Sequence, residues 1–227
     1  MERSDVGGDS GGPDPVEMAM SYRIIIPTIN ANPELLDQLL TDLDYSEIRP
    51  VSVVSGGSFA ENCNEGAADA TEDILIFLND DTMPHVGWLP PLLDAFRDPE
   101  VGIVGARLLY PDGRIQHAGV YFDAPGGILT AHNYLDDLES GDRDAVTGAC
   151  LAIRADLFRA CDGFDEGFDN GYEDVDLCLR VRAGGWRIRY CAESTLTHYE
   201  SQSGADRWRS VGANVQRLQD LWNVRSD

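Results

Sequence analysis

Two short acidic segments are the first places in this sequence where chemistry is possible. Asn79-Asp80-Asp81 directly follows the apolar run Ile74 to Leu78. Two carboxylates at the end of a strand can hold Mg²⁺ or Mn²⁺, which prefer oxygen ligands, and such a cation can stabilise a departing diphosphate. Asn-Asp-Asp also suits an ordinary turn. Taken alone, the segment leaves both readings open.

The second acidic segment, Glu173-Asp174-Val175-Asp176, opens a predicted helix. Acidic residues are favoured in a first turn by the helix dipole, which is a purely structural reason for their presence. A carboxylate at a helix start that faces a cleft can instead act as a general base toward an acceptor hydroxyl. The segment is therefore a candidate for the acid–base half of a site.

Histidine supplies one further candidate. His198 follows a short predicted strand, and its interest depends on whether it lies beside the 79–81 segment, where it would add a nitrogen ligand to a metal site. A lone histidine is more often structural, and His85, His117 and His132 have weaker individual cases. The five cysteines are widely spaced without a CxxC pair, so we expect reduced, mostly buried thiols.

The elements that must position these residues follow an alternating pattern in the first half. This β-α-β-α-β order predicts an α/β fold with a mostly parallel sheet, whose ligands bind at the carboxyl ends of the strands. The loops after Ile26, Val54 and Leu78 would share that edge. The expected strands are 22–27, 50–55, 73–78 and 101–109, and the expected helices begin at Pro33 and cover 59–70 and 86–97.

The second half is less regular. We expect strands at 115–122, 128–134, 146–153, 186–191 and 195–198, a polar loop at 136–144, and helices at 155–161, 172–183 and 206–222. Residues 1–20 are acidic and rich in glycine, and we expect a disordered tail there, followed by a single domain over 21–227.

Composition limits the partners. Asp and Glu total 40 against 17 basic residues, none of them lysine, which gives a formal charge of −23. An acidic surface disfavours a nucleic-acid backbone as a partner and is typical of high-salt or GC-rich hosts. No apolar run approaches the ~20 residues of a membrane-spanning helix. We therefore expect a cytoplasmic location.

Taken in order, several segments resemble the GT-A glycosyltransferases of family 2, in particular the bacterial subgroup similar to rhamnosyltransferases. The resemblance covers about residues 22–204. It implies a Rossmann-like, nucleotide-binding GT-A fold with a central sheet flanked by helices. The segments are Ile24–Asn30, Asn62–Gly66, Phe77–Thr82, Pro111–Gly119, Val146–Cys150, Gly163–Phe168, Tyr172–Arg180, Gly184–Ile188 and His198–Ser201.

The resemblance also implies roles for individual residues. Asp174 matches the acid that deprotonates the acceptor, with Glu173 as its neighbour. Asp81 and His198 match the ligands of the metal, Mn²⁺ or Mg²⁺. The residues implied for the nucleotide-sugar donor are Pro27, Thr28, Asn30, Asn64, Asn79, Asp80 and Gly148, and Ala149 would join Gly148 in letting the backbone approach the sugar or acceptor.

The implied activity is inverting transfer of a sugar from a nucleoside diphosphate, UDP or dTDP, to a hydroxyl of a glycan or lipid-linked saccharide. One alternative acceptor is a hydroxymethylated base in viral DNA. An alternative of another class is a non-catalytic module that binds nucleotide sugars or carbohydrate. Many family members carry an acid after the second strand, whereas residues 53–58 here contain none, so the donor base stays open. The sequence also leaves open the donor sugar, linkage and oligomeric state.

Overall fold

The computed structural model describes residues 20–29, 31–123, 129–136, 139–199 and 210–222. The helices are α1 (Pro33–Tyr45), α2 (Phe59–Ala67), α3 (Leu89–Asp94), the 3₁₀ turn η1 (Ala95–Arg97), α4 (Ala155–Ala160), α5 (Glu173–Ala183) and α6 (Val211–Trp222). The strands are β1 (Tyr22–Thr28), β2 (Val51–Ser55), β3 (Ile74–Leu78), β4 (Thr82–Pro84), β5 (Val101–Leu109), β6 (Ile115–His117), β7 (Val120–Asp123), β8 (Thr130–Asn133), β9 (Gly141–Arg143), β10 (Cys150–Arg154) and β11 (Arg187–His198).

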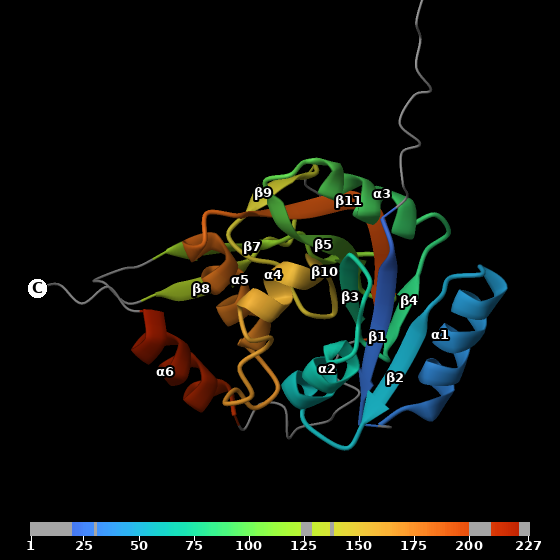
Figure 1. Ribbon diagram of the computed structural model, residues 1–227, viewed down its shortest axis with the longest axis horizontal. Coiled ribbons are helices and arrows are strands. Elements are labelled where there is room, and N and C mark those ends of the chain that lie inside the picture. Colours follow the sequence, from blue (N-terminus) through green and yellow to red (C-terminus); the bar gives the residue numbers. More distant parts are fainter. Residues whose placement is uncertain (1–19, 30, 124–128, 137–138, 200–209, 223–227) are drawn as a thin grey trace, which may run out of the picture.

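A mixed sheet forms the centre of the molecule (Figure 1). Its strand order is β2-β1-β3-β10-β5-β11-β4, with β6 added to β5 and β9 added to β11. Strands β2, β1, β3, β5 and β11 share one direction, because β10 lies antiparallel between β3 and β5. The expected α/β fold with a mostly parallel central sheet is therefore confirmed, and β3 and β11 end at the same edge.

Helices cover both faces of this sheet, which explains why its strands read as unbroken apolar runs. In β1, Ile24 and Ile26 pack with α1 in one core cluster, whereas Ile25 packs with α2 in the other. Strand β3 alternates in the same way. Figure 1 shows α1 and α3 on one side and α2, α4 and α5 on the other.

Local signals in the sequence set the helix starts near the site. Asn32 caps α1 by accepting the backbone N–H of Leu35, and Pro33 occupies the first helical position, as predicted. Ser58 caps α2 in a reciprocal capping box with Glu61. The predicted helix over 86–97 is shorter, because only α3 is α-helical and η1 tightens the last turn.

The second half differs more from expectation. The strand predicted over 115–122 breaks at Gly119, whose φ of +102° suits glycine, and a Cβ there would lie 2.4 Å from Arg143 Cγ. The strand predicted over 146–153 begins only at Cys150. The two strands predicted within 186–198 form one bulged strand, β11, and the predicted polar loop contains β9.

In the described part of the chain, every helix is too short or too polar to cross a membrane. Residues 1–19, which make up nearly all of the predicted tail, Asn30, and the start of the predicted helix over 206–222 lie outside the described residues.

Candidate active site

The end of β1 meets the loop that follows β3. Thr28, the last residue of β1, is 4% exposed, and its hydroxyl donates to the Oδ2 atom of Asp80. Burial raises the pKa of Asp80 above its ordinary value, although the Thr28 hydroxyl works in the opposite direction. Pro27 is buried inside β1, in register with Val54. Thr28 and Asp80 thus lie together at the edge of the sheet where β1 and β3 end.

Pairing of two strands brings His198 to Asp81. Thr82 at the start of β4 lies opposite His198 at the end of β11, so Asp81 comes next to the imidazole ring. The distance from His198 Nε2 to Asp81 Oδ1 is 3.1 Å, and both side chains are almost fully buried. The backbone N–H of Tyr199 donates to the Asp81 carbonyl and holds the two segments together.

A third side chain orients the His198 ring. The Nδ1 atom of His198 lies 2.7 Å from the Oε1 atom of the buried Gln116. An amide oxygen only accepts, so His198 carries its hydrogen on Nδ1 and, when neutral, presents the Nε2 lone pair to Asp81.

These atoms suit a divalent cation. Asp81 Oδ1 and Asn79 Oδ1 are buried and accept no hydrogen bond in the described part of the chain. The Asp81 oxygen and the His198 nitrogen match the ligand types that Mn²⁺ prefers, and a cation would satisfy their facing lone pairs. Among the described residues, no group of three or more His, Cys, Asp or Glu side chains gathers as a metal cage. The remaining ligands would therefore have to come from substrate or water.

Asp174 forms the second half of the site. It is the second residue of α5 and accepts the N–H of Gly148 at 2.7 Å and that of Val175 at 2.8 Å. Burial raises its pKa above the ordinary value even though these hydrogen bonds favour the charged form. A fixed carboxylate with a raised pKa has the properties of a general base.

The turn before β10 joins the two halves. The N–H of Asn79 donates to the Ala149 carbonyl at 3.0 Å, while the adjacent Gly148 N–H holds Asp174. A Cβ at Gly148 would lie 3.0 Å from Phe59 Cζ and 3.4 Å from Asp174 Cβ. Gly148 therefore contacts Asp174, the predicted base, directly, whereas the resemblance implies a donor contact for it. The predicted metal residues and the predicted base belong to one connected set of contacts.

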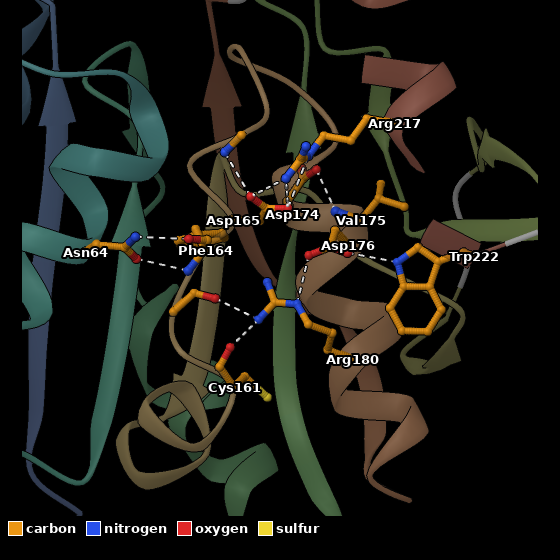
Figure 2. Close-up of polar contacts among 12 residues, drawn as sticks. Asn64, Cys161, Phe164, Asp165, Asp174, Val175, Asp176, Arg180, Arg217 and Trp222 are labelled. Carbon is orange, nitrogen blue, oxygen red and sulfur yellow. Dashed lines mark hydrogen bonds and ion pairs between the residues drawn. The ribbon is translucent and has the colours of Figure 1, made fainter. Parts of the chain in front are cut away.

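The loop that leads to Asp174 is fixed from three directions (Figure 2). Arg180 of α5 donates to the carbonyls of Cys161 and Gly163 and pairs with Asp176. Arg217 of α6 forms a bidentate ion pair with Asp165.

Asn64 of α2 holds the same loop from its other side. It accepts the Phe164 N–H at 2.9 Å and donates to Phe164 O and Glu166. The side-chain amide of Asn64 is thus engaged by the loop rather than presented to a nucleotide. In place of the donor contact implied by the resemblance, the structure gives Asn64 a role in fixing this loop.

Glu173 also has a structural contact. It is 6% exposed and accepts the Gly171 N–H at 2.6 Å, just before the α5 N-terminus. Tyr172 and Asn170 there have φ values of +74° and +49°, which non-glycine residues adopt only at a cost. Glu173 stabilises this strained approach to Asp174.

The structure gives contacts at the site to three residues for which the sequence predicts no specific role, although His117 is among the weaker histidine candidates. Gln116 orients His198, His117 accepts the Thr147 N–H at 3.2 Å, and Asn62 bridges Gly57 to the Thr28 carbonyl. All three lie in segments that carry the family resemblance, but that resemblance had given them no role. The contacts with His198, Thr147 and Thr28 join residues distant in sequence, which no local pattern reveals.

Comparison with known proteins identifies the family. Residues 34–216 match the family model described as "Glycosyltransferase like family 2", and the chain belongs to this family. An O-antigen biosynthesis protein of Myxococcus xanthus is 35% identical over 66% of this chain and 13% of its own length. An N-acetylglucosaminyl-diphospho-decaprenol L-rhamnosyltransferase of Mycobacterium tuberculosis is 30% identical over 61% of this chain and 52% of its own length. The chain thus spans only part of each relative.

Solved structures support the fold. GalNAc-T7, whose structure contains UDP, GalNAc and Mn²⁺, has a TM-score of 0.67 at 14% identity, with 91% of this chain and 48% of that chain covered. The mannosyltransferase PcManGT from Pyrobaculum calidifontis, in complex with GDP-Man and Mn²⁺, has a TM-score of 0.57 at 14% identity, over 85% and 61% of the two chains. At this identity the likeness shows the GT-A fold.

Proposed function

We propose that this chain is a metal-dependent, inverting glycosyltransferase domain. Its donor would be a nucleoside diphosphate sugar, UDP- or dTDP-linked, and its acceptor a hydroxyl of a glycan or lipid-linked saccharide. The observation that carries the proposal is that the Asp81–His198 pair and Asp174 are linked through one turn. The loop that carries Asp81 bonds through the Asn79 N–H to the Ala149 carbonyl, and the adjacent Gly148 N–H holds Asp174. A cation-binding pair and a fixed carboxylate are the two parts that this reaction needs.

The chemistry assigns each residue one task. Asp174 takes the proton of the acceptor hydroxyl while that oxygen forms a bond to the anomeric carbon. The bond from the anomeric carbon to the phosphate oxygen breaks on the opposite face, and the nucleoside diphosphate leaves with the electron pair. Asp81 and His198 would hold a Mn²⁺ or Mg²⁺ ion, which supplies positive charge to the departing diphosphate. Thr28 and Asp80 would bind the nucleotide.

The relatives and the charge favour a saccharide acceptor. One relative is named for O-antigen biosynthesis and another for transfer to a diphospho-decaprenol-linked sugar. A formal charge of −23 opposes the phosphate backbone of DNA, which the viral-DNA alternative would require.

A thermal-shift screen of nucleotide sugars tests the donor half. With Mn²⁺ present, the correct donor should raise the melting temperature by mass action, and EDTA should abolish the rise. Asp81→Asn should lose that stabilisation. Asp174→Asn should keep it.

Turnover tests the chemical half. Asp174→Asn should lower the transfer rate by roughly 10²- to 10⁴-fold. Asp37→Asn, an exposed aspartate on α1 outside these contacts, is the matched control and should leave the rate unchanged. NMR of the first product should show an inverted anomeric configuration. A protein that binds a donor but never transfers or hydrolyses it would contradict the proposal and indicate a non-catalytic module.

A further inference from the structure

Two adjacent residues of β6 reach both halves of the candidate site. Successive side chains of a strand point to opposite faces, so Gln116 and His117 contact different neighbours. Strand β6 pairs with the end of β5, with His117 opposite Leu108. Gln116 is 7% exposed and His117 is 3% exposed. Because buried polar side chains are normally hydrogen-bonded, each of these two residues is expected to have a specific hydrogen-bond partner.

Gln116 serves the cation side. Its Oε1 atom accepts the Nδ1–H of His198 at 2.7 Å, and its Nε2 donates to the His198 carbonyl at 3.4 Å. A histidine that ligates a metal is held in this way in many sites, because a partner on one ring nitrogen fixes the lone pair of the other. The ring therefore points Nε2 at Asp81 before any cation binds.

His117 serves the base side. Its Nε2 atom accepts the Thr147 N–H at 3.2 Å, and its ring also has a side-chain hydrogen bond with Asn133. Burial lowers the pKa of His117 to about 3, so the ring stays neutral and keeps the lone pair that this contact needs. Thr147 precedes Gly148, whose N–H holds Asp174.

These contacts close a ring through the site. From Asp81 the contacts pass to His198, to the Gln116–His117 pair and to Thr147. The chain continues to Gly148, which holds Asp174, and to Ala149, whose carbonyl accepts the N–H of Asn79, two residues before Asp81. We propose that Gln116 and His117 form a two-sided positioning unit, in which Gln116 presents His198 to the divalent cation and His117 sets the backbone that holds the base. This inference rests on the proposed function and assigns residues to its two halves.

The first experiment examines Gln116 without any sugar transfer. The chain has four histidines, so long-range ¹H–¹⁵N NMR of histidine-labelled protein can follow each tautomer. Wild-type His198 should carry its hydrogen on Nδ1. Gln116→Leu should lose this preference and weaken Mn²⁺ binding by about 10- to 100-fold, measured by Mn²⁺ EPR titration. Gln116→Glu keeps an accepting oxygen and should restore both the tautomer and the affinity.

The second experiment separates His117 from Gln116. His117→Leu should lower kcat by on the order of 10- to 100-fold because the base shifts, while Mn²⁺ affinity and donor KM stay near wild type. His117→Gln, whose Oε1 atom can replace the Nε2 acceptor, should recover most of the rate. Gln38→Leu, an exposed glutamine on α1, is the control and should change none of these quantities.

The outcomes distinguish this inference from a structural role and from the proposed function. A structural role would lower the melting temperature and move Mn²⁺ affinity and kcat together in both variants, which would overturn the inference. Equal Mn²⁺ affinity in Gln116→Leu and wild type would also overturn it. If no nucleotide sugar reacts but Gln116→Leu still weakens Mn²⁺ binding and Gln116→Glu restores it, the proposed function fails while the assignment of Gln116 stands. If the wild-type protein does not bind Mn²⁺, both the proposed function and the assignment of Gln116 are contradicted.

Discussion

His198 Nε2 lies 3.1 Å from Asp81 Oδ1, although 116 positions separate the two residues in the chain. The pairing of β4 with β11 produces this contact, and Gln116 fixes which ring nitrogen takes part. When the ring is neutral with its hydrogen on Nδ1, Asp81 Oδ1 and His198 Nε2 are both acceptors, so no hydrogen bond forms between them. This arrangement supports the proposed cation site.

The first prediction concerns that pair. His198→Ala should weaken Mn²⁺ binding by more than about 100-fold, since loss of a ligand should exceed the effect of losing its supporting partner. Isothermal titration with Mn²⁺ in the presence of the nucleoside diphosphate measures the change. His85→Ala is the control, because His85 contacts Thr197 and not Asp81. Equal affinities in the two variants would remove His198 from the metal site.

The second prediction is a pH dependence that arises from Asp174. Its pKa is raised by burial, and only the ionised carboxylate can accept a proton. The value of kcat/KM should therefore rise with pH through a point above the ordinary aspartate pKa of about 3.9. The residual rate of Asp174→Asn should not show this rise with pH. An unchanged pH profile in Asp174→Asn would assign the limb to another group.

The same raised pKa has a consequence for stability. The folded state holds the proton of Asp174 more tightly than the unfolded state, so this group's contribution to the free energy of unfolding decreases as pH rises from the unfolded to the folded pKa. Urea unfolding of wild type and Asp174→Asn across that range should show the wild type losing stability relative to the variant. A constant difference would mean that the pKa is equal in both states.

The third prediction separates two roles for Asn64. Its amide fixes Phe164 and Glu166, so Asn64→Ala should lower the free energy of unfolding by about 1–3 kcal/mol, because the backbone of the buried Phe164 loses two hydrogen bonds. The donor dissociation constant should stay unchanged. Urea melts and a donor titration test both statements. A large loss of donor affinity without loss of stability would return Asn64 to the nucleotide site.

The fourth prediction concerns the space at Gly148. Gly148→Ala places a Cβ 3.0 Å from Phe59 Cζ and close to Asp174, so the backbone donor must shift and kcat should fall by on the order of 10- to 100-fold. Phe59→Leu in the same chain should relieve the contact and restore part of the rate. A double-mutant cycle on kcat measures this coupling. Additive effects would mean that the ring of Phe59 does not limit this position.

Much of the fold could be predicted from the sequence. The apolar run of β3 bounded by Asn79, the Asn32–Pro33 start of α1 and the acidic start of α5 are local patterns, and each gave the correct element. The small and apolar residues of 146–149 predict a strand, whereas the structure has an irregular turn there. Its conformation depends on Asp174 and His117, which lie elsewhere in the sequence.

The residue types for a cation and for a base are fixed by the sequence alone, because carboxylates and an imidazole are present whatever the fold. Their combination into one site depends on tertiary structure. Hydrogen bonding between strands far apart in the chain sets the register that joins Asp81 to His198 and places Gln116 and His117 behind them. The tertiary structure also decides that Asn64 bonds to the backbone of Phe164, because a side-chain amide forms hydrogen bonds with the backbone that folds against it.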